Sequence, residues 1–246
     1  MNFMHIPPIR LEEIDSTNAE AFRMLKAGKP MEGTCIIARY QHSGRGQRSN
    51  QWLSRPNENL LASFILYPPP HAADNPFLLS KTMALAVHDT IQSFTKLDVQ
   101  IKWPNDILVR KKKIAGILME NQWQGSAWHA AVIGIGINVN QQKFEIEHAT
   151  SLAIESDELI TIDNVLVSLQ NNLSHRYNQF CKRESSTLIE NYQDNLFGRD
   201  EFYSYETDQG TIMGKVLQVL NDGHLQLEQP NGHRHAYSLN ELRLIY

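Results

Sequence analysis

Four short apolar segments joined by tight connections constrain most strongly what this chain can fold into. They cover residues 99–103, 107–110, 114–121 and 127–140. Parallel strands need long crossover connections, whereas antiparallel neighbours can be joined by a turn of a few residues. The segments therefore predict a mixed, largely antiparallel sheet and not an alternating array of strands and crossover helices.

Helical periodicity appears on both sides of these strands. Thr17 and Glu20 have the spacing of a capping box and open the first helix, while Asn75-Pro76 opens a long amphipathic one. Its apolar stripe is Leu79, Met83, Val87, Ile91 and Phe94. Two further helices follow near residues 165–177 and 188–196, so the fold class is α+β, with helices flanking the sheet.

The last fifty or so residues differ in character, with short β segments and no helical pattern. Asp222-Gly223 and Asn231-Gly232 are strong hairpin turns between them. This pattern predicts a small C-terminal β-barrel. We expect a catalytic domain over residues 1–197 and the barrel over 198–246.

Composition excludes several classes of protein. The formal charge of −4 and the pI near 6.2 argue against sequence-independent binding of nucleic acid. The chain has no apolar run of the roughly eighteen residues that a membrane helix needs. Cys35 and Cys181 lack metal-ligand spacing and are expected to be reduced thiols, the first on a buried strand. We therefore expect a cytoplasmic protein that binds neither nucleic acid nor membranes.

The stretch Gly44–Trp52 contains two glycines, two guanidinium groups and an indole in nine residues, directly after a predicted strand. Free backbone N–H groups and fixed positive charge suit a ligand that carries phosphate or carboxylate. A solvated connection is the alternative. A dinucleotide-binding loop is rejected, because the segment from Trp52 to Pro56 cannot begin the helix that such a motif requires.

Four other segments contain residues suited to binding or chemistry, and each has a plainer explanation. Ser16-Thr17-Asn18 could simply cap a helix, and Lys102–Asp106 could be an ordinary turn. Lys113-Ile-Ala-Gly116 begins a strand beside a basic hairpin tip. Gly134-Ile-Gly136-Ile-Asn138 either packs closely in a sheet or lets another group approach its backbone.

The order of these motifs is more specific than any one of them. Ser-Thr-Asn, Gln41-x-x-Gly-Arg-Gly, Lys-Trp-Pro-Asn-Asp, Lys-Ile-Ala-Gly-Ile-Leu and Gly-Ile-Gly-Ile-Asn follow one another along essentially the whole chain. This series resembles the biotin protein ligases, or biotin–[acetyl-CoA-carboxylase] ligases. The resemblance implies a class II synthetase-like catalytic domain and an SH3-like C-terminal barrel. It also implies activation of biotin by ATP and Mg²⁺ to biotinyl-5′-AMP, with release of pyrophosphate. The biotinyl group then passes to a lysine of a carboxylase's biotin carboxyl carrier protein.

The resemblance also assigns roles to residues of this chain. The biotin site would contain Ser16, Thr17, Asn18, Gln41, Arg45, Gly46, Gln47 and Lys113. ATP would be bound by Arg48, Trp52, Lys102, Trp103, Asn105 and Asn138, with Asp106 as the Mg²⁺ ligand. Arg45, Arg48 and Lys113 would be the catalytic cations, which offset charge repulsion between the biotin carboxylate and the α-phosphate.

This chain departs from the family pattern at two loop positions. Well-known members have Gly-Arg-Gly-Arg-Arg-Gly, whereas Gln47 and Ser49 here replace an arginine and a glycine. The loss of one charge bears on how tightly the acyl-adenylate is retained. Only about fifteen residues precede Ser16, so we expect no N-terminal DNA-binding domain of the kind that some members carry.

Two other functions stay open. One is a lipoate ligase or octanoyl transferase of the same fold, and the other is a non-catalytic, biotin-responsive regulator. A homodimer formed through an exposed sheet edge is also possible.

Overall fold

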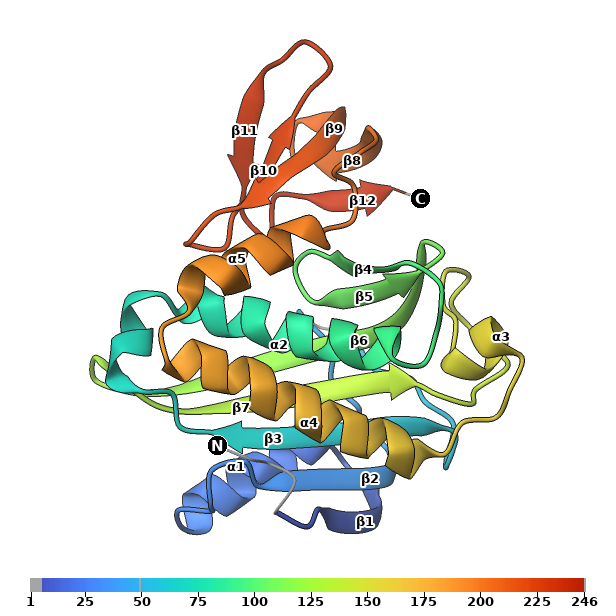
Figure 1. Ribbon diagram of the computed structural model, residues 1–246, viewed down its shortest axis with the longest axis vertical. Coiled ribbons are helices and arrows are strands. Elements are labelled where there is room, and N and C mark those ends of the chain that lie inside the picture. Colours follow the sequence, from blue (N-terminus) through green and yellow to red (C-terminus); the bar gives the residue numbers. More distant parts are fainter. Residues whose placement is uncertain (1–5, 49, 246) are drawn as a thin grey trace.

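The computed structural model describes residues 6–48 and 50–245. Its larger sheet has seven strands in the order β1-β2-β3-β7-β6-β5-β4 (Figure 1). These are β1 Ile9–Ile14, β2 Cys35–Gln41, β3 Asn59–Leu66, β4 Val99–Lys102, β5 Asp106–Val109, β6 Lys112–Gln124 and β7 Ala127–Asn138. Within the described residues β1 and β2 run parallel and the other neighbours antiparallel. The predicted mixed, largely antiparallel sheet is confirmed.

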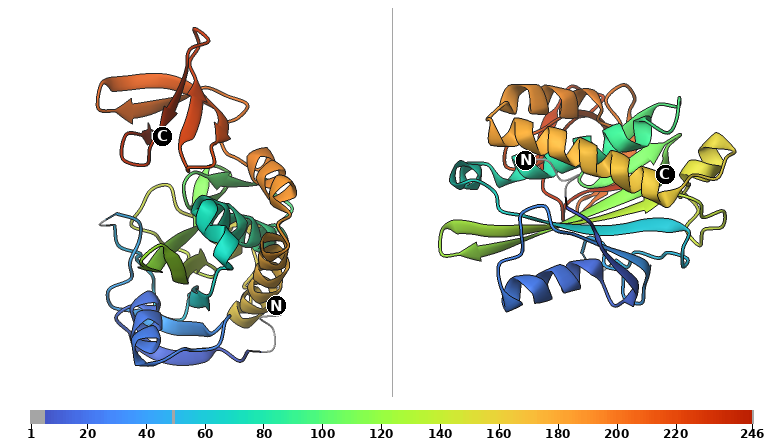
Figure 2. Two further views of the ribbon diagram at one scale, coloured as in Figure 1. Left: turned by 90° about the vertical axis from the view of Figure 1, so that its left-hand side faces the viewer. Right: turned by 60° about the horizontal axis from the view of Figure 1, so that its bottom comes forward.

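The helices lie on both faces of this sheet, but unequally. They are α1 Thr17–Ala27, α2 Pro76–Gln92, α3 Leu152–Ser156, α4 Ile162–Cys181 and α5 Ser185–Asp194, with a short 3-10 helix at Pro70–Asp74. In the left view of Figure 2, α2, α4 and α5 lie on one side of the sheet and α1 on the other. The predicted stripe on α2 faces the core, since Leu79, Met83, Val87 and Ile91 have no exposed surface.

Strand alternation decides which side chains face which helices. On β3, Leu60, Ala62 and Phe64 belong to the core shared with α2 and α4. Ile65 instead belongs to a small cluster with Ala21 of α1. Successive side chains on a strand point to opposite faces, so the even positions face α2 and the odd ones face α1. Because α1 is short, part of the second face stays free for other groups.

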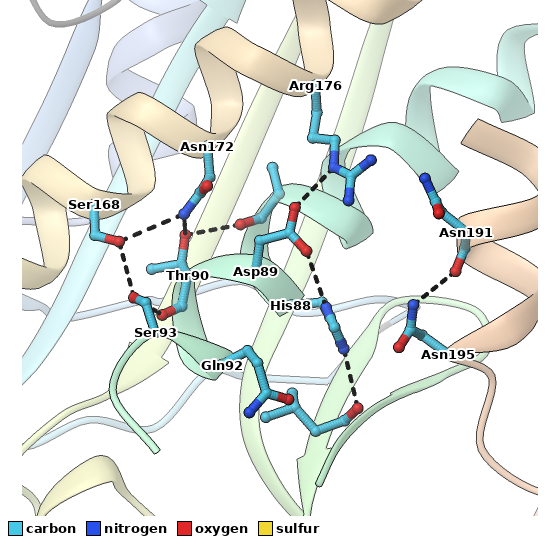
Figure 3. Close-up of polar contacts among 12 residues, drawn as sticks. His88, Asp89, Thr90, Gln92, Ser93, Ser168, Asn172, Arg176, Asn191 and Asn195 are labelled. Carbon is cyan, nitrogen blue, oxygen red and sulfur yellow. Dashed lines mark hydrogen bonds and ion pairs between the residues drawn. The ribbon is translucent and has the colours of Figure 1, made fainter. Parts of the chain in front are cut away.

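A polar network fastens α2 to α4 and β4 (Figure 3). Arg176 Nε donates to Asp89 Oδ2 at 2.7 Å, and His88 Nδ1 lies 3.2 Å from Asp89 Oδ1. The other ring nitrogen of His88 lies 3.0 Å from the Val99 carbonyl oxygen. Burial alone would raise the pKa of Asp89, but hydrogen bonds from His88 and Arg176 lower that pKa below its usual value.

The C-terminal strands form a separate antiparallel sheet in the order β11-β10-β9-β8-β12, drawn at the top of Figure 1. They are β8 Tyr203–Thr207, β9 Gly210–Val219, β10 Leu225–Glu228, β11 Arg234–Tyr237 and β12 Arg243–Ile245. Both predicted hairpin turns are present, with positive φ at Gly223 and Gly232. This sheet is compatible with the predicted SH3-like barrel. The predicted boundary at residue 198 falls between α5 and β8 and stays a prediction.

Some local predictions differ from the structure. The sequence patterns do not reveal β1, α3 or β12, which are short and carry little apolar periodicity. The capping box is also not formed. Ser16 is the N-cap of α1 without a side-chain cap bond, and Glu20 pairs with Arg23 at 2.6 Å. The polar side chains at this helix start point elsewhere, toward the site described below.

Both cysteines are free, as predicted, with Cys35 buried and Cys181 exposed. Burial raises the pKa of the Cys35 thiol to about 12, so this thiol stays protonated at neutral pH. Among the described residues, the helices are too short or too polar to cross a membrane.

Candidate active site

Two rows of residues across β3, β7 and β6 form the floor of a cavity on the α1 face of the sheet. In register, Ser63 pairs with Gly134 and Gly134 with Leu118. The next row pairs Gly136 with Gly116. The two glycines of β7 leave the backbone open to the groups above it. A Cβ at Gly134 would collide with the Asn18 side chain, and one at Gly136 with the Trp52 indole.

A chain of hydrogen bonds joins the start of α1 to the sheet. Gln41 Oε1 accepts from the Thr17 backbone N–H at 2.7 Å and from its hydroxyl at 3.1 Å. Ser63 Oγ lies 2.7 Å from Thr17 Oγ1 and 2.5 Å from Asn18 Oδ1. Asn18 Nδ2 then donates to Glu120 Oε2 at 2.8 Å. Ser16, Thr17 and Asn18 are each at most 4% exposed, so these polar groups are fixed by one another.

Ser63 and Glu120 were not among the residues predicted for the site. Ser63 is the one polar side chain within the otherwise apolar run from Leu60 to Leu66, a signal that could have identified it. Glu120 also accepts from Arg45 Nη2 at 3.0 Å. Glu120 therefore connects the start of α1 to the glycine-arginine loop, which is the stretch Gly44–Trp52.

The glycine-arginine loop is a small hairpin in its described part. Arg45 and Gln51 form an antiparallel bridge. The Trp52 N–H donates to the Gly44 carbonyl at 3.0 Å, and the Gly46 N–H to the Asn50 carbonyl at 2.8 Å. Ser49, where a departure from the family pattern was noted, lies outside the described residues. The hairpin carries Trp52 back over the sheet, where its indole contacts the floor.

Lys113 of β6 reaches the cavity from the opposite side. Its ammonium lies 2.6 Å from Asp106 Oδ1 and 5.4 Å from the centre of the Trp52 ring. The turn before β5 is fixed beside it, because Asn105 Nδ2 donates to the Ile117 carbonyl at 2.8 Å and the Ile117 N–H donates back at 2.9 Å. Two strands and a turn thus hold the lysine and its carboxylate partner in place.

The eight residues predicted to bind biotin surround this one cavity. They are Ser16, Thr17, Asn18, Gln41, Arg45, Gly46, Gln47 and Lys113. Of the residues predicted for ATP, Trp52 and Asn105 also line it. The sequence pattern thus located a shared cavity, and the roles of these residues in binding stay predictions.

Four residues predicted for ATP do not line the cavity. Arg48 is exposed on the loop, and Lys102 lies 3.7 Å from Asp106 Oδ2. Asn138 is buried and donates to the Thr150 carbonyl at 2.9 Å. Trp103 is 9% exposed and its Nε1–H donates to the carbonyl of Gly223, in the C-terminal sheet, at 2.9 Å. Trp103 therefore contacts the turn between β9 and β10 of the second sheet, and its role in ATP binding stays a prediction.

The Trp52 indole lies against Gly116 and Gly136 and leaves little room in the cavity. Its free volume is about 50 Å³, well below the several hundred Å³ that a ligand site usually offers. A second cavity of about 300 Å³ lies between the loop and residues 141–146. Gln41 and Trp52 line both cavities, so the two cavities are neighbours.

The protein donors near Asp106 do not fit a dedicated magnesium site. The described residues contain no cluster of three or more His, Cys, Asp or Glu side chains that could hold a metal ion. The carboxylate of Asp106 is already shared by Lys113 and Lys102, which leaves little net negative charge for a cation. Mg²⁺ is often bound by one or two carboxylates together with substrate phosphates, and the phosphates would have to supply most of the ligands here. Asp106 as a metal ligand stays a prediction.

Residues 11–138 match the model of the biotin/lipoate A/B protein ligase family. The chain belongs to the biotin/lipoate A/B protein ligase family.

Several similar proteins are named as ligases, some of them as biotin ligases. The bifunctional ligase/repressor BirA of Bacillus subtilis is 32% identical over 230 residues, which are 92% of this chain and 70% of the relative. The biotin–[acetyl-CoA-carboxylase] ligase of Paracoccus denitrificans is 37% identical over 132 residues, 52% of this chain and 53% of the relative. The solved biotin protein ligase of Aquifex aeolicus, in complex with biotin and ATP, superposes with a TM-score of 0.79 and is 26% identical in sequence. The match covers 96% of this chain and 97% of the Aquifex aeolicus chain.

Proposed function

We propose that this protein is a biotin protein ligase, which activates biotin with ATP and transfers it to a lysine of a biotin carboxyl carrier protein. One observation carries the proposal: the eight residues assigned to biotin by their motifs surround a single cavity, with Arg45 and Lys113 both facing it. The relative named as a biotin–[acetyl-CoA-carboxylase] ligase and the similar solved biotin protein ligase support the same activity.

In the first step a carboxylate oxygen of biotin attacks the α-phosphorus of ATP, and pyrophosphate leaves. Two anions must approach each other, so fixed cations are needed where negative charge accumulates. Arg45 comes from the loop and Lys113 from β6, and each is held by a carboxylate, Glu120 and Asp106 respectively. Magnesium bound to the phosphates would add to this charge compensation.

In the second step the neutral amine of the target lysine attacks the carbonyl carbon of the anhydride, AMP leaves, and the nitrogen loses its extra proton to solvent. The anhydride is already activated, so the enzyme needs no nucleophile of its own. Its task is to position the partners and keep water out. The hairpin that carries Trp52 is the natural lid, because the cavity in this structure is too small to admit the ligand.

The hydrogen-bond chain beside α1 favours biotin over lipoate. The ureido group of biotin offers both donors and acceptors to the side chains of Thr17, Asn18 and Gln41. An acid without such a head would leave any displaced polar group unpaired, at a cost of roughly 1–3 kcal/mol each. We place the reaction in the cytoplasm, where reduced cysteines and carboxylase carrier proteins occur together.

The experiment is incubation of the protein with ATP and either biotin or lipoate, followed by mass spectrometry of the nucleotide products. Biotinyl-5′-AMP is expected, with little lipoyl-AMP. Formation of lipoyl-AMP alone would replace the proposal with the lipoate ligase alternative. If neither adenylate forms while biotin still binds, the non-catalytic regulator becomes the better account.

A further inference from the structure

Side chains of α2, of α5 and of the segment before β5 bind the connection between β9 and β10, residues 219–224. Lys81 Nζ of α2 donates to the carbonyls of Val219 at 2.8 Å and Leu220 at 3.1 Å. Gln193 of α5 makes a reciprocal pair with Val219, at 3.0 Å and 3.1 Å. The Trp103 indole donates to Gly223. These bonds go to backbone groups, so they fix the position of the turn itself.

Lys81 is an unusual residue for a purely structural contact. It is 1% exposed and lies 5.7 Å from the ring centres of both Phe77 and Tyr192. Its ammonium is bonded to carbonyl oxygens, and burial of such a charge is costly compared with an apolar side chain of similar size. The advantage of a lysine over an apolar side chain here is that its two hydrogen bonds fix the position of the β9–β10 turn.

The 219–224 turn is connected to the candidate active site through Trp103. Trp103 begins the turn of residues 103–106 that precedes β5, and Asn105 of this turn lines the cavity. The last residue, Asp106, holds the ammonium of Lys113 at 2.6 Å. The segment of residues 103–106 is therefore held at both ends. Trp103 is hydrogen-bonded to the C-terminal sheet, and Asp106 forms an ion pair with the predicted catalytic lysine, Lys113.

We propose that Lys81 and Trp103 are positioning residues, which use the 219–224 turn to hold the 103–106 segment, and thereby Lys113, in the geometry needed for adenylation. This inference rests on the proposed function. Seven of the eight residues predicted for biotin lie at the start of α1, at the end of β2 or in the loop, and only Lys113 is linked to this turn. Loosening the turn should therefore slow the reaction more than it weakens biotin binding.

Two glycines of the C-terminal sheet provide a matched pair of variants. Gly223 has φ +92°, and a Cβ there would lie 2.6 Å from Cδ2 of Phe77. Gly232 has φ +81° in the next hairpin turn, with nothing within 4 Å of the same position. Alanine imposes similar backbone strain at both sites, but only Gly223→Ala displaces the turn from α2.

The test measures biotinyl-5′-AMP formation by the whole chain, with biotin and ATP varied separately. Gly223→Ala is expected to lower kcat roughly tenfold, about the effect of one lost hydrogen bond, while KM for biotin changes less than twofold. Gly232→Ala is expected to match the wild-type protein. Equal kinetics in the two variants would overturn the inference.

Trp103→Phe supplies a second variant in case Gly223→Ala does not fold. It removes the indole donor and keeps the ring, and the inference predicts a lower kcat. A raised KM for ATP with unchanged kcat would instead support the predicted contact with ATP and contradict the positioning role.

Hydrogen exchange provides a readout that does not depend on activity. Backbone amides of residues 103–117 are expected to exchange faster in Gly223→Ala than in Gly232→Ala. If the wild-type protein forms no biotinyl-5′-AMP, the proposed function fails. The exchange rates of Gly223→Ala and Gly232→Ala would still decide whether the 219–224 turn holds the 103–106 segment. Equal exchange in the two variants would show that it does not.

Discussion

Lys113 Nζ and Asp106 Oδ1 lie 2.6 Å apart, at the point where β6 passes the turn that precedes β5. The pair joins the predicted catalytic lysine to the predicted metal ligand. The ammonium is thus held close to Trp52 and the cavity by a carboxylate that cannot move far, because Asn105 beside it is bonded twice to Ile117. Such fixed charge is what stabilisation of a transition state requires.

Replacement of Lys113 by alanine should remove most of the adenylation activity. Loss of a positioned group that contacts the transition state typically costs roughly 3–4 kcal/mol, or about 10²–10³ in rate. The matched control is Lys112→Ala, because Lys112 is the exposed neighbour on the same strand. Initial rates of pyrophosphate release would check the pair, and similar rates in both variants would remove Lys113 from the mechanism.

Replacement of Asp106 by asparagine separates two roles for this carboxylate. Because Asp106 already pairs with two lysines, we expect a lower rate at every Mg²⁺ concentration and an unchanged midpoint of the metal titration. The measurement is adenylation rate against free Mg²⁺. A midpoint shifted to higher Mg²⁺ would instead support the predicted role as a metal ligand.

Replacement of Gln47 by arginine should improve retention of the intermediate. Gln47 lines the cavity where well-known family members carry an arginine, and a charged hydrogen bond to the acyl-adenylate is worth roughly 1.5–3 kcal/mol. Release of free biotinyl-5′-AMP into solution should slow by about tenfold or more. Gln124→Arg, at the exposed end of β6 and outside the cavity lining, is the control for added charge. Equal release by all three proteins would mean that the missing charge does not matter.

Lys81 makes a specific contribution to the pH dependence of stability. Burial lowers the pKa of this lysine from 10.5 to about 8, although nearby Asp222 acts in the other direction. Between pH 8 and 10 the unfolded chain keeps a proton that the folded chain has lost. The free energy of unfolding should therefore rise with pH, by up to about 1.4 kcal/mol per pH unit from this group.

Urea unfolding of the wild-type protein and of Lys81→Met across pH 7–10 would isolate this contribution. Other groups titrate in the same range, but they are common to both proteins. The difference in unfolding free energy should change with pH in favour of the wild type. A difference that stays constant would show that Lys81 is protonated equally in the folded and unfolded states.

The long elements of this fold could be predicted from the sequence because their periodicity is strong. The apolar stripe of α2 and the runs that correspond to β6 and β7 are examples. The edge strand β1, with the pattern Ile-Arg-Leu-Glu-Glu-Ile, buries too little surface to show alternation. The five-residue helix α3 is too short for a helical repeat.

Residues of the site were predictable where they belong to contiguous motifs. The motifs place Asn18, Gln41 and Lys113 at one cavity although they lie far apart in the chain. Glu120 was missed because it is a single acidic residue that follows the apolar run Ile114–Met119 of β6, and its role depends on its contact with Arg45. The contact of Trp103 with Gly223, 120 positions later, was not predicted because it leaves no local signal in the sequence.

The most direct test of the central claim is transfer of biotin to a carrier domain. The protein would be incubated with biotin, ATP, Mg²⁺ and a biotin carboxyl carrier domain, and the carrier's mass measured. A carrier whose target lysine is replaced by arginine serves as the control. The account predicts one biotinyl group on the intact carrier and none on the control, with the product lost in the Lys113→Ala protein. An unmodified carrier, or one modified only when lipoate or octanoate replaces biotin, would contradict it.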